Sequence, residues 1–224
     1  IDAINKKVYE KSDQQVNALY NAGRKESLEH FEEIYKTLGT KFDYYFFESE
    51  TAPNGINIVR EHPNIFVESE GAIVYHGEKH GLHTRVFITS KGLPTYETKE
   101  LGLAQMKTAR WPFDVSITVT AHEQSEYFEV VLAAMREVLP DLAPKIQHIS
   151  HGMMRLPNGK MSSRMGNVIT GESLLAELVE SAKARAAESR AKDTDALAKD
   201  VAVAAIKYQI LKQASGRDII FDRE

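Results

Sequence analysis

Lys160, Ser162 and Ser163 are the residues whose types and spacing first suggest chemistry, because a cation and two hydroxyl donors stand within four positions. The turn formers Pro157, Asn158 and Gly159 end any regular structure just before them. Cations, hydroxyls and free backbone N–H groups ahead of a helix start can hold a polyphosphate. The stretch is therefore a candidate phosphate-binding loop, and the alternative is a solvated turn with incidental charge.

The composition is that of an ordinary globular protein. The 224 residues are 42% hydrophobic and 27% charged, which suffices for one large domain or one domain with an appendage. No apolar run is long enough to cross a bilayer and no signal peptide is recognisable, so we expect a cytoplasmic protein without membrane contact. The start without methionine, in the middle of a helical pattern, suggests a fragment.

Cysteine usage and charge exclude several classes of function. With no cysteine there can be no disulfide and no thiolate chemistry, and a metal would need histidine and carboxylate ligands. The net charge of −4 gives no global attraction for nucleic acid. RNA binding would therefore depend on a local basic face.

Helical periodicity predicts two packed helices at the start of the chain. Ser12 and Gln15 have the spacing of a capping box ahead of the first one. One face of the second helix carries apolar residues at helical spacing, namely Leu28, Phe31, Tyr35 and Leu38. Gly39 would end this helix in the left-handed conformation. The aromatic run 41–49 predicts a buried strand or an extended crossing.

From Glu50 to about Thr95, frequent proline and glycine predict a small β-rich insertion. Two strands are expected there, at 72–75 and 84–89. The spacing of His76, His80 and His83 raises a metal site as a possibility, but the intervening glycines argue against the single helix that would align them. We expect loop histidines and no metal site.

After Tyr96 the pattern is that of an α/β fold. Thr98 can cap a helix that runs to about Arg110, where Pro112 enforces a stop. A strand over 115–119, a helix over 127–139 and a strand over 146–149 follow. This order predicts a partial doubly wound, Rossmann-like parallel sheet, in which ligands bind at the carboxyl ends of the strands. The Lys160 loop leaves the last of these strands.

Beyond Thr170 the pattern is entirely helical, so we divide the chain into a catalytic domain at 1–170, with its insertion at about 50–95, and a helical linker and stem-contact region at 171–224. Basic residues recur in the second part among acidic ones. Two interpretations stay open: a solvated helix surface and an RNA-facing stripe.

Lys160-Met161-Ser162-Ser163-Arg164 resembles the nucleotide-binding signature of class I aminoacyl-tRNA synthetases, usually written K-M-S-K-S. Other stretches are similar to one member of that class, the arginyl-tRNA synthetases, and fall in that family's order along nearly the whole chain. These stretches are Ser27 to Ser49, Tyr96 to Gly102, Gln124 to Phe128, Ala205 to Tyr208 and Ile219 to Asp222.

The resemblance implies that arginine is activated with ATP, with Mg²⁺ accompanying the nucleotide, and transferred to tRNA(Arg). In-line displacement at a phosphate needs mainly positioning and charge neutralisation. By resemblance, Lys160 neutralises phosphate charge, Ser162 and Ser163 donate hydrogen bonds, and Met161 packs near the adenine. His151, Gly152 and Met153 would line the ATP site from the strand end.

The amino acid side follows from the same resemblance. A guanidinium is planar with five donors and needs a carboxylate and further acceptors in fixed geometry. Tyr96, Glu100 and Gln124 match the family's arginine-binding tyrosine, acidic residue and glutamine, although the acidic residue is more often aspartate. Without the resemblance, Tyr96 would be an ordinary strand aromatic and Glu100 an acid favoured by the helix dipole.

Some family features are missing. Ser163 stands where the signature has its second lysine, so that charge must come from Arg164 or from outside the chain. The His-x-Gly-His signature is absent, and the run at 80–83, His-Gly-Leu-His, is a decoy because its glycine is misplaced and a strand should follow. No anticodon-binding domain is recognisable.

We therefore expect a monomeric central fragment of an arginine–tRNA ligase, inactive alone. The alternatives are a free-standing RNA- or protein-binding module and another class I synthetase, such as the cysteinyl or class I lysyl type.

Overall fold

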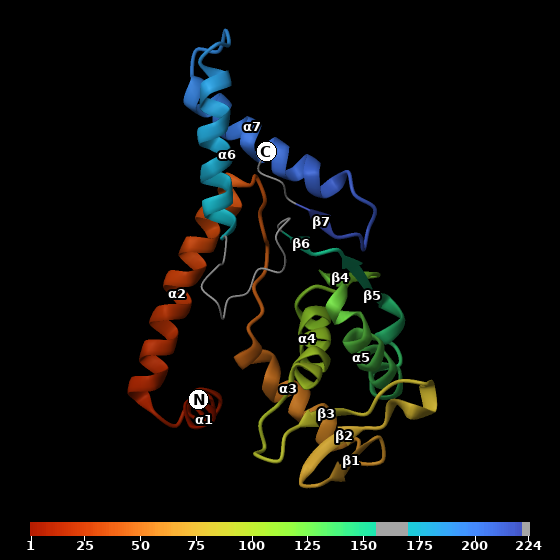
Figure 1. Ribbon diagram of the computed structural model, residues 1–224. Helices are drawn as coiled ribbons and strands as arrows, with labels where there is room; N and C mark the ends of the chain where they lie inside the picture. The colour runs from red at the N-terminus through yellow and green to blue at the C-terminus, as the bar shows by residue number, and fades with distance from the viewer. Residues whose placement is uncertain (156–169, 221–224) are drawn as a thin grey trace. The chain divides into compact units, whose positions relative to one another are not determined.

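The computed structural model describes residues 1–155 and 170–220 (Figure 1). The chain divides into two units, the first formed by Ile1–Lys25 and Phe42–Ser150 and the second by Glu26–Lys41 and His151–Glu224. Helix α2 (Gln14–Thr37) begins in the first unit and ends in the second.

The first unit combines helices with two small sheets. Its elements besides the start of α2 are α1 (Asp2–Glu10), α3 (Glu48–Glu61), β1 (Phe66–Ser69), β2 (Ala72–Tyr75), η1 (Gly77–His80), β3 (Arg85–Ile88), α4 (Tyr96–Arg110), β4 (Ser116–Ala121), η2 (His122–Gln124), α5 (Ser125–Val138), η3 (Ala143–Lys145) and β5 (Ile146–His151). Strands β1, β2 and β3 form one sheet in that order, and β4 and β5 form another. The run β4–α5–β5 matches the predicted strand, helix and strand.

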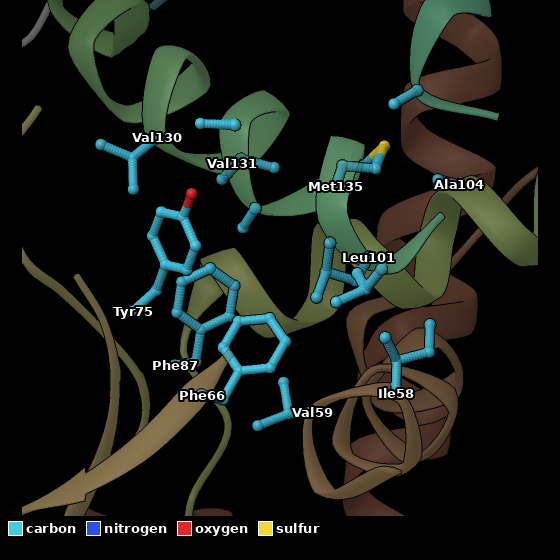
Figure 2. Packing of buried hydrophobic residues seen from close by; sticks show 14 of the residues in the cluster. Ile58, Val59, Phe66, Tyr75, Phe87, Leu101, Ala104, Val130, Val131 and Met135 are labelled. Carbon is cyan, nitrogen blue, oxygen red and sulfur yellow. The ribbon is translucent and has the colours of Figure 1, made fainter. Parts of the chain in front are cut away.

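Buried apolar side chains from α3, α4, α5 and the three-stranded sheet meet in one cluster (Figure 2). Phe66, Tyr75 and Phe87 come from the three strands, and their rings lie 4.7 to 6.1 Å apart between centroids. Leu101 of α4 and Met135 of α5 are also fully buried. This cluster fixes α4 and α5 against the sheet, and α4 carries Tyr96 and Glu100, two of the three residues predicted to bind arginine.

Helices α3 and α4 cross at a pair of glycines. A Cβ on Gly55 would lie 1.9 Å from the carbonyl oxygen of Thr98, and one on Gly102 would lie 2.1 Å from that of Thr51. The prediction that β-rich structure begins at Glu50 is wrong, because α3 occupies Glu48–Glu61 and contains Pro53. The helix tolerates Pro53, because a proline removes only one backbone hydrogen bond. It contains Gly55 because the crossing with α4 leaves no room for a side chain at that position.

The three-stranded sheet confirms the two strands predicted in the insertion. Antiparallel pairing sets Phe66 opposite Tyr75 and Val74 opposite Val86. The Tyr75 hydroxyl donates to Glu137 Oε1 of α5 at 2.6 Å, and Lys79 Nζ lies 2.5 Å from Glu137 Oε2. These contacts join the sheet and the short helix η1 to α5.

The histidines of this region make local contacts. His76 Nδ1 lies 3.0 Å from the Thr84 hydroxyl, and His80 Nε2 lies 3.4 Å from Glu137 Oε1. Strand β3 follows the run at 80–83, as the decoy interpretation requires. Among the described residues, no group of three or more histidine, cysteine or carboxylate side chains could hold a metal ion.

Three predicted helix boundaries need correction. The two packed helices predicted between Ser12 and Gly39 are one continuous helix, α2, and the short α1 precedes it. Asp13, not Ser12, accepts the backbone N–H groups of Gln15 and Val16 at the start of α2. Helix α4 begins at Tyr96 instead of at Thr98. The Thr98 hydroxyl is buried and donates to the Phe87 carbonyl, so it anchors the helix to β3 and does not cap it.

The second unit contains α6 (Gly171–Ala186), α7 (Thr194–Leu211), β6 (Met154–Arg155) and β7 (Ile219–Ile220). Thr170 and Asp193 cap the two helices through their side chains. Gly39 has φ +64°, which confirms its predicted left-handed conformation. The prediction that everything beyond Thr170 is helical is wrong, since β7 pairs in parallel with β6. Two residues are too few to produce a strand pattern in the sequence.

No helix in the described part of the chain is both long enough and apolar enough to span a membrane.

Candidate functional site

The predicted arginine-binding residues Tyr96 and Glu100 lie on the first turns of α4. The hydrogen bond between Thr98 and Phe87 and the burial of Leu101 hold this part of α4 against the sheet. The Tyr96 ring is 64% exposed, whereas Glu100 is half-buried. Helical spacing of four residues puts the two side chains on neighbouring turns of one face.

The charges of three carboxylates act on the phenol of Tyr127, which lies on α5. Burial and the nearby charges of Glu100, Glu97 and Glu48 raise the pKa of Tyr127, so the phenol keeps its proton as a hydrogen-bond donor. Glu97 is buried, and Arg85 lies 3.6 Å from its Oε1 atom. Arg85 pairs with Glu97 and Lys99 pairs with the exposed Glu48, whereas Glu100 is half-buried.

The environment of Glu100 disfavours its charge. Burial raises the pKa of Glu100, the positive charge of Lys107 opposes that rise, and the charge of Glu48 adds to it. Buried carboxylates of this kind gain most from a cationic partner, because such a partner restores the charged form.

Lys99 supplies one cation in this region. Its Nζ atom lies 2.7 Å from Glu48 Oε2 and 4.8 Å from the centre of the Tyr96 ring. Burial by itself lowers the pKa of Lys99, but hydrogen bonds to Glu48 and Tyr9 outweigh that effect and raise it. The ammonium is therefore charged at neutral pH.

Gln124 is exposed and ends the short helix η2, immediately before α5. It is the N-cap residue of α5 and precedes Tyr127 by three positions. Its role in binding arginine stays a prediction.

The residues predicted to line the ATP site belong to the second unit. Gly152 is buried against the C-terminal strand, because a Cβ on it would lie 1.9 Å from the Arg217 carbonyl oxygen. The backbone N–H of Met153 donates to Asp218 Oδ1 at 2.9 Å, and the N–H of Ile219 donates to the Met153 carbonyl at 2.9 Å. His151 is exposed, and its Nδ1 atom donates to the carbonyl of Gly152 at 2.7 Å.

Lys160, Met161, Ser162, Ser163 and Arg164 lie outside the described residues, so their predicted phosphate-binding roles stay predictions.

Sequence reasoning gave no role to several residues that the structure brings to these sites. Glu48 and Tyr127 join Tyr96 and Glu100 in the first unit, and Asp218 holds the strand of Met153 in the second. The sequence does carry a signal for Glu48, since this acid directly follows the aromatic-rich residues 42–47 and begins a helix. No sequence pattern pairs Asp218 with Met153, because 65 positions separate them.

Comparisons with known proteins cover nearly the whole chain. The family model described as tRNA synthetases class I (R), catalytic domain, matches residues 6–223. A curated arginine–tRNA ligase of Lactobacillus delbrueckii subsp. bulgaricus is 34% identical over 220 residues, which cover 96% of this chain and 39% of that protein. The ligase of Treponema pallidum subsp. pallidum is 30% identical over 223 residues, with coverage of 96% and 38%. The chain thus spans well under half the length of these relatives.

Solved structures give a consistent fold. The arginyl-tRNA synthetase of Plasmodium falciparum aligns with a TM-score of 0.78 and 21% identity over 95% of this chain and 37% of that one. The Thermus thermophilus enzyme aligns with a TM-score of 0.69 and 22% identity over 95% of this chain and 44% of that one. At these identities the likeness concerns the fold, and it confirms the α/β class predicted from the sequence.

Proposed function

Because the chain belongs to the arginine-type class I tRNA synthetases, catalytic-domain family, we propose that it is the central part of an arginine–tRNA ligase. The match of this family model to residues 6–223 carries the proposal, because it extends through both units. The reaction has two steps. The carboxylate of arginine attacks the α-phosphorus of ATP and pyrophosphate leaves, and then a terminal ribose hydroxyl of tRNA(Arg) attacks the carbonyl carbon and AMP leaves.

The guanidinium of arginine is the ligand that best suits the first unit. Glu100 and Glu48 are carboxylates near one protonated phenol, and Tyr96 presents an exposed aromatic ring beside them. A planar guanidinium can bind carboxylates with paired N–H groups and stack on an aromatic face at the same time. In this proposal Glu100 binds the guanidinium charge, Glu48 adds a second acceptor, and Gln124 contributes an amide.

The ATP side of the proposal rests on the second unit. His151, Gly152 and Met153 line the nucleotide, and Lys160, Ser162 and Ser163 bind its phosphates, with Met161 near the adenine. The support in the structure is that β6 and β7 hold the segment before residue 156 in a defined position. Mg²⁺ ordinarily enters such sites on the phosphates of the nucleotide, so the proposal needs no protein cage for it.

The partners in this proposal are ATP, arginine and tRNA(Arg), and the location is the cytoplasm, with a monomer as the assembly. The exposed basic residues of α6 and α7 include Lys183, which pairs with Glu180 at 2.6 Å. That ion pair favours a solvated helix surface at Lys183. For the remaining basic residues of these two helices, the proposal is that they face tRNA.

The test is amino acid-dependent exchange of pyrophosphate into ATP by the complete protein that contains these residues. We expect exchange with arginine, and none with cysteine or lysine. Glu100→Ala should abolish it, whereas the matched change Glu126→Ala, at an exposed position on α5, should not. Exchange with cysteine or lysine in place of arginine would favour another class I synthetase, and no exchange with any amino acid would favour a binding module.

A further inference from the structure

The cation position of the candidate arginine site is occupied by a side chain of the protein itself. Lys99 Nζ lies 2.7 Å from Glu48 Oε2, 4.8 Å from the centre of the Tyr96 ring and 5.5 Å from that of Tyr9. A carboxylate and two aromatic faces are the groups that recognise a cationic ligand. The ammonium therefore contacts two of the groups, Glu48 and Tyr96, that a guanidinium would use.

This ion pair differs from an ordinary surface pair in its burial. The Lys99 side chain is only 12% exposed, although Glu48 is 56% exposed. Its partners come from three helices, since Tyr9 lies on α1, Glu48 on α3 and Tyr96 on α4 itself. Solvent can reach the carboxylate, and so can a ligand, whereas the ammonium is enclosed on the protein side.

We propose that Lys99 is a tethered competitor that determines the specificity of this site, an inference that rests on the proposed binding of arginine. An incoming cation must displace the Lys99 ammonium from Glu48 before it can use that carboxylate. A guanidinium gains over the ammonium, because its planar donors can bind Glu48 and Glu100 together. The ammonium of free lysine offers Glu48 nothing that Lys99 does not already supply, so lysine is rejected by a competing contact of the protein itself.

A supporting role for Lys99 predicts the opposite result. If the ammonium only held Glu48 in place, its removal would release the carboxylate and weaken the binding of arginine. If the ammonium competes, its removal leaves Glu48 without a cation and strengthens the binding of any cationic amino acid. The direction of the change therefore separates a competitor from a positioning residue.

The experiment measures the dissociation constants of L-arginine and L-lysine by calorimetry in the complete protein. We expect Lys99→Met, which keeps the apolar stem and removes the charge, to bind arginine about 1.5-fold to fivefold more tightly, the range of a partly exposed ion pair. Lysine binding should improve by a larger factor. The dissociation constant of lysine divided by that of arginine therefore falls. Lys99→Arg should weaken arginine binding below the wild-type level, because a tethered guanidinium competes better.

Lys79 provides the matched control. Its Nζ atom lies 2.5 Å from Glu137 Oε2 and 5.3 Å from the centre of the Tyr75 ring, so Lys79→Met removes the same kind of carboxylate and aromatic contact on another part of the unit. We expect no change in the arginine or lysine constants. Lys99→Arg keeps the charge and so provides the test even where Lys99→Met fails to fold.

The outcomes also separate this inference from the proposed function. Weaker or unchanged arginine binding by Lys99→Met, in a protein whose wild type binds arginine, overturns the competitor role alone. Failure of the wild type and of both Lys99 variants to bind arginine overturns the proposed function and this inference with it.

Discussion

Glu100 shows how one residue type takes its meaning from its surroundings. In the sequence it is an acid in the first turns of a helix, where the helix dipole already favours negative charge. In the structure it is half-buried, its charge acts on the Tyr127 phenol, and burial raises its own pKa. A carboxylate in such a place gains stability from binding a cation, which is the property that the proposed function requires.

The raised pKa of Glu100 predicts a pH dependence of arginine binding. A carboxyl group whose pKa is raised loses its charge at a higher pH than an ordinary glutamate, whose value is 4.5. The arginine dissociation constant should therefore rise as the pH falls toward that raised pKa. Calorimetric titrations of arginine into the complete protein at a series of pH values from neutral downward measure this rise.

Glu100→Gln should weaken arginine binding by about tenfold to a hundredfold at neutral pH, the effect of losing a charge-assisted hydrogen bond. The remaining binding should also lose most of its dependence on acidic pH. Glu126→Gln, an exposed change on α5, serves as the control and should keep the wild-type curve. A pH dependence that persists unchanged in Glu100→Gln would assign it to another group.

At the scale of elements, the crossing of α3 and α4 brings Glu48 to Lys99 and close to Glu100. The two helices approach closely because Gly55 and Gly102 have no side chains, and the backbone of the other helix fills the space. Any side chain at either glycine would force the helices apart. The spacing of the carboxylates on α3 and α4 therefore depends on these two positions.

Gly102→Ala should lower the free energy of unfolding by about 1–3 kcal/mol or more, as overpacking does, because its Cβ would meet the Thr51 carbonyl at 2.1 Å. Gly23→Ala is the control, since this helical glycine has nothing within 4 Å and alanine there should stabilise by about 0.5–1 kcal/mol. Urea unfolding followed by circular dichroism measures both changes. Equal effects of the two substitutions would contradict the close crossing.

The pairing of β6 with β7 gives Asp218 a positioning role for the predicted ATP segment. Its Oδ1 atom accepts from the Met153 N–H at 2.9 Å, and Arg155 Nε lies 2.7 Å from its Oδ2 atom. A carboxylate that binds both groups fixes the strand that leads toward residue 156. The segment 218–220 thus holds the candidate nucleotide segment through the Asp218 side chain as well as through backbone pairing.

Asp218→Ala should raise the KM for ATP of the complete protein about tenfold, through the loss of a charge-assisted hydrogen bond. The arginine dissociation constant should stay within about twofold, the scatter of surface substitutions that add less than ~0.5 kcal/mol. Steady-state pyrophosphate exchange at varied ATP and calorimetry with arginine measure the two effects. Asp200→Ala, at an exposed position on α7, is the control. A matching loss of arginine binding would mean that Asp218 supports the whole fold.

At the scale of the whole molecule, the two candidate sites belong to different units. The carboxylates proposed for arginine lie in the first unit, and the segment proposed for ATP lies in the second. Transfer between substrates requires both to be held at once. The chain also covers only 39% of a curated relative that it matches, so residues elsewhere in such a protein can complete either site.

We therefore expect the isolated 224-residue chain to show no arginine-dependent exchange of pyrophosphate into ATP, with or without tRNA. The complete protein assayed in parallel should show it. Radiolabelled pyrophosphate incorporated into ATP is the readout, and circular dichroism confirms that the isolated chain is folded. Robust exchange by the isolated chain would show that its two units suffice for activation.

Much of the fold and part of the site could be predicted from local pattern. The helical stripe of α5, the alternation of β4, the hairpin of β2 and β3 and the left-handed Gly39 depend on short-range rules of periodicity and turn chemistry. Tyr96 and Glu100, which the resemblance assigns to arginine binding, lie on the first turns of α4, and that assignment stays a prediction. These features need only neighbours in the sequence to be recognised.

Only the tertiary structure decided the rest, because it depends on contacts between distant residues. Pro53 and Gly55 predicted a break, yet the close crossing with α4 accommodates a helix there. The sequence predicts Thr98 as a helix cap, but its hydroxyl donates a hydrogen bond to the Phe87 carbonyl instead. The sequence by itself determined the α/β class and the family, since those follow from local order along the chain. Which cation pairs with Glu48, and which acid holds Met153, follow from long-range packing that no local pattern encodes.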